Sequence, residues 1–240
     1  MTKLPPEHEF DDLQTVVPFG VLLLLLLAAI SGAFAAIAIL PGWLPGLSES
    51  LAGSTPKAFW FLSRSSAGIA FVLIWLSMLL GLAITNKFAR VWPGGPVAYD
   101  LHQYFSLLGL VFAVFHALIL MGDQYIHYSL RDVLIPFASS SYRPLWVGLG
   151  QTGLYMTAIV AFSFYFRRQI TPKHWRKIHY LSFLGYGFTL LHGIYSGTDS
   201  AIFWVNRFYL GSAGVLLFFL IYRLLLGYIK AKPRVKPSAT

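Results

Sequence analysis

The chain has 240 residues, of which 57% are hydrophobic and only 11% are charged, and its formal net charge is +9. A soluble domain carries about 25% charged residues, so this composition predicts a membrane protein. The lack of cysteine excludes disulfides, iron–sulfur clusters, thiolate zinc sites and covalent c-type haem attachment. The excess of Lys and Arg lies in particular loops, as membrane topology requires, and we therefore expect no nucleic-acid partner.

Six apolar segments predict an all-α, polytopic bundle of six transmembrane helices, each near the roughly 20 residues that span a bilayer. The segments cover residues 16–40, 66–85, 101–121, 145–166, 178–197 and 204–228. We expect residues 1–15 to form an N-terminal tail, residues 16–229 the six-helix domain, and residues 230–240 a basic tail. The acidic start of the chain does not fit the basic beginning of a secretory signal, so the first segment is expected to be retained.

The distribution of Lys and Arg predicts the orientation. With six spans, one side of the membrane holds both tails and the second and fourth loops. That side carries Lys3, Lys87, Arg90, Arg167, Arg168, Lys173, Arg176, Lys177, Lys230, Lys232, Arg234 and Lys236, whereas the other carries Lys57, Arg64, Arg131, Arg143 and Arg207. The positive-inside rule therefore predicts a protein of the cytoplasmic (plasma) membrane with both termini in the cytoplasm.

Four histidines lie inside two of the apolar segments, where ionisable side chains are rare and usually functional. His102 and His116 are 14 residues apart in the third segment, and His179 and His192 are 13 apart in the fifth. Both segments run outward, so the depths match in pairs, about 20 Å apart. Neutral imidazole is a good iron ligand, and two axial imidazoles leave no open iron position. The pattern therefore predicts two stacked haems that transfer electrons.

The helical period fits one segment better than the other. A 14-residue step returns to within about 40° of the same helix face, but a 13-residue step misses it by about 140°. The fifth segment would therefore need a bend, which Gly185 and Gly187 could allow, or ligands that approach from different sides. Each ligating ring should also pass its second N–H to an acceptor, and the sequence does not show which groups accept.

At these residues the chain resembles the ferric reductase-like transmembrane domain, the haem-bearing core of ferric-chelate reductases and NADPH oxidases. The resemblance runs from Arg64 to His192 and rests on the four histidines and on the sequence His174–His179 that leads into the fifth segment. It implies two b-type haems, an inner one on His102 and His179 and an outer one on His116 and His192. It also implies that Arg64 lies near the outer haem, although Arg64 could simply reach the interface.

Two departures from the family shape the expected partners. Many relatives continue into a flavin and nicotinamide dehydrogenase domain, but only about a dozen residues follow the sixth segment here. Flavin or NAD(P)H is therefore expected only through a partner, and the donor is expected to be a cytoplasmic flavoprotein reductase or a quinol. Superoxide-producing relatives carry a further histidine where this chain has Leu120, which argues against oxygen as the dedicated acceptor.

Several other residues have two interpretations. Arg176 and Lys177 could pair with inner-haem propionates, or they could be ordinary cytoplasmic charges. The loop from Asp123 to Pro144 is long and partly apolar, and we expect it to cover the outer haem and shape the exit site.

The leading hypothesis is an oxidoreductase subunit that needs a separate donor protein. It would pass single electrons to an extracytoplasmic acceptor such as a ferric chelate, a redox protein or oxygen. The alternative is a transporter or channel whose histidines carry protons or metal ions. That alternative needs acidic partners inside the spans, and only Asp100 and Asp199, both near span ends, are candidates. A purely structural subunit would leave the four histidines unexplained.

Overall fold

The computed structural model describes residues 15–43, 58–123 and 126–231. Within these ranges the chain is all-helical, with no strand. The main helices are α1 (Phe19–Trp43), α3 (Ala58–Thr85), α4 (Gly95–Ile119), α5 (Leu130–Leu134), α6 (Pro144–Tyr165), α7 (Pro172–Ser196) and α8 (Phe203–Ala231). Residues 1–14 and 232–240, most of the two predicted tails, lie outside the described residues.

Each of the six predicted segments coincides with one long helix, but three of the helices begin earlier than predicted. Helix α3 starts at Ala58 rather than residue 66. Helix α4 starts at Gly95 rather than residue 101, and α7 at Pro172 rather than residue 178. Both α4 and α7 have proline in the first turn, where the missing N–H is harmless. The apolar run therefore marks only part of each helix, because polar first turns extend beyond it.

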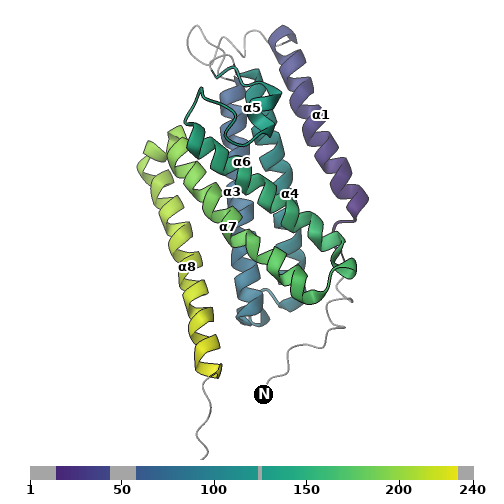
Figure 1. Ribbon diagram of the computed structural model, residues 1–240, viewed down its shortest axis with the longest axis vertical. Coiled ribbons are helices and arrows are strands. Elements are labelled where there is room, and N and C mark those ends of the chain that lie inside the picture. Colours follow the sequence, from purple (N-terminus) through teal and green to yellow (C-terminus); the bar gives the residue numbers. More distant parts are fainter. Residues whose placement is uncertain (1–14, 44–57, 124–125, 232–240) are drawn as a thin grey trace, which may run out of the picture.

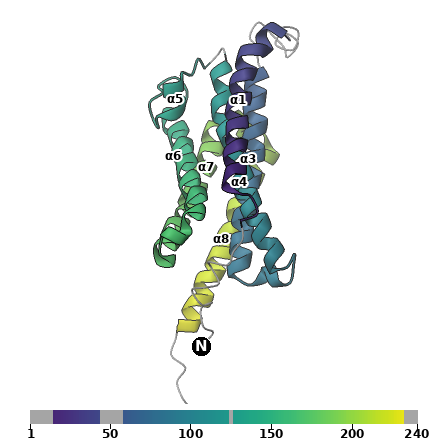
Figure 2. The same ribbon diagram turned by 90° about the vertical axis from the view of Figure 1, so that its right-hand side faces the viewer.

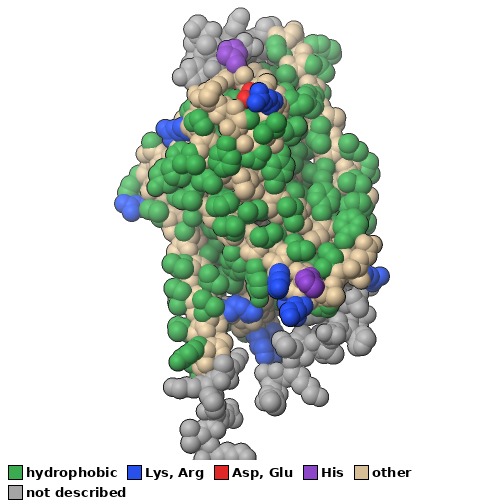
Figure 3. Space-filling view, in the orientation of Figure 1, with side chains coloured by type: hydrophobic (Ala, Val, Ile, Leu, Met, Phe, Trp, Pro, Cys, Tyr) green, Lys and Arg blue, Asp and Glu red, His purple; other side chains and the backbone are tan. Residues whose placement is uncertain are grey.

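Five of the described helical segments are long and apolar enough to cross a membrane, by length and composition. They lie at Phe19–Trp43, Ala58–Thr85, Gly95–Gly122, Pro144–Tyr165 and Phe203–Ile229. Side chains on their outer faces are apolar and exposed, such as Leu24 at 66% and Phe218 at 65%. A broad hydrophobic surface separates the two ends of the molecule (Figure 3). These features indicate a multi-pass membrane protein.

The long helices form two layers with α8 at their edge (Figures 1 and 2). One layer holds the antiparallel pair of α3 and α4, with α1 packed along α4. The other holds α6 and α7, which pack on each other and cross the first layer obliquely (Figure 1). Residues of α4 and α7 can therefore meet between the layers.

Glycines fix the close approach within each layer. A Cβ atom on Gly109 of α4 would lie 2.9 Å from the Cγ1 atom of Ile74 on α3. A Cβ atom on Gly153 of α6 would lie 3.0 Å from the carbonyl oxygen of Gly185 on α7. Helix α7 is continuous through Gly185 and Gly187, so the bend considered from the sequence does not occur. Its two histidines instead leave the helix from different sides, as a 13-residue step requires.

Candidate functional site: two histidine pairs

The four histidines of the apolar segments meet in two pairs between the layers. His116 of α4 faces His192 of α7, with ring centroids 6.1 Å apart and ring planes at 70°. His102 of α4 faces His179 of α7, with centroids 6.0 Å apart and planes also at 70°. We call these the outer pair and the inner pair. The pairing matches the depth argument, and the two sites have nearly the same geometry.

Backbone carbonyl groups determine the protonation of three of these rings. The contacts are His116 Nδ1 to Ser63 O at 2.8 Å, His102 Nδ1 to Ser77 O at 2.8 Å, and His192 Nδ1 to Trp146 O at 3.0 Å. A carbonyl oxygen can only accept a hydrogen bond, so in each neutral ring Nδ1 carries the proton and donates it. The unprotonated nitrogen is then Nε2, and this is the tautomer that binds a metal ion through Nε2.

The separation within each pair suits a shared metal ion. Two imidazoles bound through Nε2 on opposite sides of one ion, at about 2.0–2.1 Å each, place their ring centroids about 6 Å apart. In the part of the chain that the structure describes, no group of three or more His, Cys, Asp or Glu side chains converges on a metal site. Each pair thus supplies two protein ligands, and a metal ion held there would take its other ligands from a prosthetic group.

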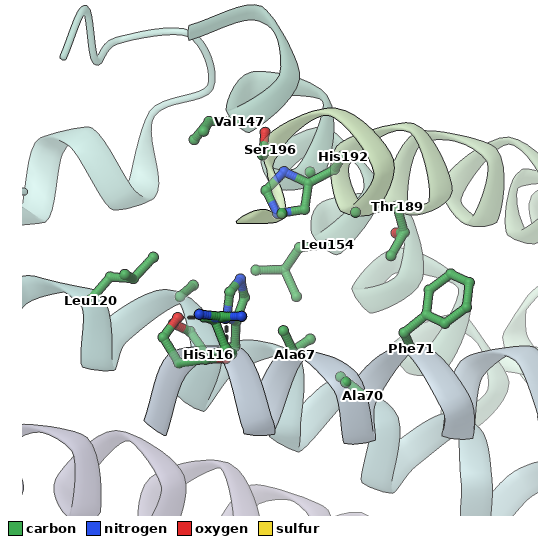
Figure 4. A pocket seen from close by; sticks show the side chains of 18 of the residues that line it. Ala67, Ala70, Phe71, His116, Leu120, Val147, Leu154, Thr189, His192 and Ser196 are labelled. Atoms are coloured by element: carbon green, nitrogen blue, oxygen red, sulfur yellow. Dashed lines mark hydrogen bonds between the residues drawn. The ribbon is translucent and has the colours of Figure 1, made fainter. Parts of the chain in front are cut away.

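A cavity of about 370 Å³ surrounds the outer pair. Figure 4 shows His116 and His192 pointing toward one another across it, with small residues such as Ala67 and Ala70 on the α3 side. Phe71 and Leu154 add apolar walls. Ligand sites have volumes of about 300–1,000 Å³ and are mostly apolar with a few polar groups. The outer pair therefore sits in a space of the size and character of a cofactor site.

An ion pair lies beside this cavity. Arg64 of α3 pairs with Asp199, and both residues line the cavity. Their side chains are 32% and 36% exposed, so the pair sits at the rim. The structure therefore places Arg64 next to the outer pair, where the resemblance implied it. The guanidinium has a carboxylate partner, which the sequence did not indicate.

The long loop between α4 and α6 covers the cavity on another side. Tyr128 and Val133 of this loop are buried and line the cavity. The side-chain amide nitrogen of Gln151 on α6 donates to the carbonyl oxygens of Asp132 at 2.6 Å and Val133 at 2.8 Å. The Tyr155 hydroxyl donates to the carbonyl of Leu134. The loop is thus held down on α6 by side chains that reach its backbone.

A capping box orders the short helix α5 within this loop. The Asp132 amide donates to the Ser129 hydroxyl oxygen, and the Asp132 carboxylate accepts from the Ser129 hydroxyl and amide. Hydrogen bonds from the Ser129 side chain and backbone hold the pKa of Asp132 below its ordinary value.

The inner pair lies near the basic end of α7. Trp175 stacks on His179, with ring centroids 5.1 Å apart and planes at 22°. A Cβ atom on Gly81 of α3 would lie 3.2 Å from the Cε1 atom of His102, so this glycine leaves room for the ring. Arg176 and Lys177 are exposed on the first turns of α7, before His179. Their proposed contact with an inner cofactor stays a prediction.

Several residues of the site escaped the sequence reasoning. Ser63, Ser77 and Trp146 supply the carbonyl acceptors that the histidine rings require. Gly150 is the closest neighbour found for an outer histidine, because a Cβ atom there would lie 2.5 Å from Nδ1 of His192. The available signal was the spacing of Ser63 and Ser77, which equals that of His102 and His116. Helix α3 has other serines, so this spacing was not distinctive by itself.

Comparison with known proteins shows the family of the chain. It belongs to a family described as Domain of unknown function (DUF8596), whose match covers residues 58–199. The matched range begins with α3 and includes all four paired histidines, Arg64 and Asp199. No curated protein and no solved structure shows significant similarity to the chain.

Proposed function

We propose that the protein is a six-span, di-haem b-type cytochrome that carries single electrons across the cytoplasmic membrane. The observation that carries this proposal is the pair of matched histidine sites. Each has ring centroids about 6 Å apart, and three of the four rings hold the Nδ1–H tautomer that leaves Nε2 for iron. Helix α7 is the proposed sixth span. It has 25 residues like α4, and its polar residues include two of the paired histidines.

The residues around the outer pair fit a haem. His116 and His192 would hold the iron, and the apolar walls of the cavity would contact the macrocycle. Arg64 at the rim would meet an anionic edge group, for which it would exchange its present partner Asp199. Haem supplies one-electron redox chemistry, and two axial imidazoles leave no position for a substrate at the metal.

The residues around the inner pair have a related part. His102 and His179 would hold the second iron, and Trp175 would pack against His179 at the basic end of α7. The side chains of Arg176 and Lys177 would attract an acidic donor surface or haem carboxylates at this end. We propose a cytoplasmic flavoprotein reductase or a quinol as donor and an extracytoplasmic acceptor such as a ferric chelate, a redox protein or oxygen. An inside-negative potential helps outward electron transfer by about 2.3 kcal/mol per 100 mV for full transit.

Vesicles that contain the purified protein test this function. Ferricyanide is trapped inside, dithionite is added outside, and the bleaching of ferricyanide is followed. We expect faster bleaching than in protein-free vesicles, and the extra rate should be lost in His192→Ala. The same bleaching with and without the protein would overturn the proposal. Leakage is controlled by vesicles that contain His192→Ala, since these carry the same mass of membrane protein.

A further inference from the structure

Two serines of α3 touch the histidines of α4 in the same way at both levels. Ser63 meets His116 and Ser77 meets His102, and each serine pairs with its histidine in the same antiparallel register. Nδ1 lies 2.8 Å from the Ser63 hydroxyl oxygen in the outer pair and 3.0 Å from the Ser77 hydroxyl oxygen in the inner pair. The same contact therefore occurs twice, 14 residues apart on each helix.

The hydroxyl protons have another acceptor. The Ser63 hydroxyl donates to the His116 carbonyl at 3.2 Å, and the Ser77 hydroxyl donates to the His102 carbonyl at 3.1 Å. Since Nδ1 already carries a proton that the serine carbonyl accepts, the hydroxyl oxygen faces the ring as an acceptor. Each Nδ1–H is therefore shared between two oxygens of one serine.

This arrangement differs from what the other hydroxyls of α3 do. Ser65, Ser66 and Thr85 donate to carbonyls three or four residues back in the same helix. Such bonds are the ordinary use of a hydroxyl in a helix. Ser63 and Ser77 are 2% and 5% exposed and reach across to α4 instead.

The inner level has one additional hydroxyl. Ser106 of α4 lies 2.9 Å from the Ser77 hydroxyl oxygen and donates to the His102 carbonyl. It therefore competes for the same carbonyl and contacts His102 Nδ1 only through Ser77. The effect of Ser106 on the ring should be indirect and smaller than that of Ser77.

We propose that Ser63 and Ser77 are positioning residues that set the basicity of their histidines, and through them the redox potential of each site separately. This inference rests on the proposed di-haem function. A stronger acceptor at Nδ1–H makes the imidazole a better donor to iron, which favours the oxidised form because that form carries one more positive charge. Removal of either hydroxyl should therefore raise the potential of its own haem and leave the other unchanged.

The experiment is a redox titration of the full-length protein with Ser63→Ala or Ser77→Ala. We expect about a tenfold change in the equilibrium constant between reduced and oxidised forms, which is about 59 mV upward for a one-electron couple. The shift should appear in the outer haem for Ser63→Ala and in the inner haem for Ser77→Ala. Ser106→Ala should shift the inner haem less. Ser163→Ala is the matched control, because this buried α6 hydroxyl donates to Val160 in its own helix.

Further variants cover poor folding and separate the two claims. Ser63→Thr and Ser77→Thr keep the hydroxyl and should restore the wild-type potentials. Ser63→Cys is nearly isosteric with a weaker acceptor, and should shift the outer haem in the same direction but less. Two haems with unchanged potentials in the Ala and Cys variants would overturn this inference alone. A wild-type protein without haem would overturn the proposed function and this inference with it.

Discussion

Gly150 offers a sharp test of the outer site, because its lack of a side chain makes room for a ligand ring. A Cβ atom at this position would lie 2.5 Å from Nδ1 and 2.6 Å from Cγ of His192. Real contacts of a Cβ atom are not this short, so Gly150→Ala must displace the ring and lengthen its hydrogen bond to the Trp146 carbonyl. The change leaves both histidines in the sequence and alters only their positions.

The expected loss can be estimated from these contacts. Disturbing the second shell of a metal ligand typically lowers affinity by about 10–100-fold, which is about 1.4–2.7 kcal/mol. Alanine also favours a helix over glycine by about 0.8–1.0 kcal/mol, so the helix itself is not weakened. Gly150→Ala should therefore lose the outer haem selectively while the protein stays folded.

Haem content per chain measures this effect, with the pyridine haemochrome assay applied after competition with an apo-haem acceptor. Gly187→Ala is the matched control, because this α7 glycine lies between the two levels and a Cβ atom there meets nothing within 4 Å. We expect about one haem per chain in Gly150→Ala and about two in Gly187→Ala. Two haems retained with wild-type affinity in Gly150→Ala would refute the reasoning.

Three other predictions follow from the rim and the loop. Arg64→Gln should weaken retention of the outer haem more than Asp199→Asn does, because only Arg64 can pair with an anionic group; equal effects in the same competition assay would contradict this role. Deletion of residues 131–140 should slow reduction of an external acceptor while dithionite still reduces both haems, and normal acceptor rates in stopped-flow traces would disprove a covering role for the loop. The lowered pKa of Asp132 means that its carboxylate stabilises the α5 cap above its ordinary value of 3.8 and loses this effect as the pH falls through the folded-state pKa; hydrogen exchange of the loop should thus be constant from neutral pH down to that range, and an earlier loss of protection would count against the cap.

The sequence predicted the elements that apolar composition and spacing determine. Long apolar runs locate the helices, and the positions of His102 and His179 within two parallel segments predicted that they would meet. Helix α7 shows the limit of this reasoning, because its 13-residue step fits no single helix face. Only the oblique crossing of the two layers, which depends on the packing of all the helices, brings both of its histidines to α4.

The supporting shell was beyond the reach of one sequence for a related reason. A backbone carbonyl such as that of Trp146 accepts a hydrogen bond whatever its side chain is, so residue type carries no signal. Ser63 resembles Ser65 and Ser66 until the register of α3 against α4 is known. Arg64 carried a family resemblance, but its partner Asp199 is 135 residues away along the chain.

Haem stoichiometry in four single variants tests the central claim most directly. The wild-type protein should bind two b-type haems per chain, seen in the reduced-minus-oxidised spectrum and counted by pyridine haemochrome. The variants His116→Ala and His192→Ala should each lose the outer haem, and His102→Ala and His179→Ala should each lose the inner haem. Each variant would then retain about one haem, with the two members of a pair giving the same residual spectrum. No haem in well-folded wild-type protein, or two haems retained in any single variant, would contradict the account.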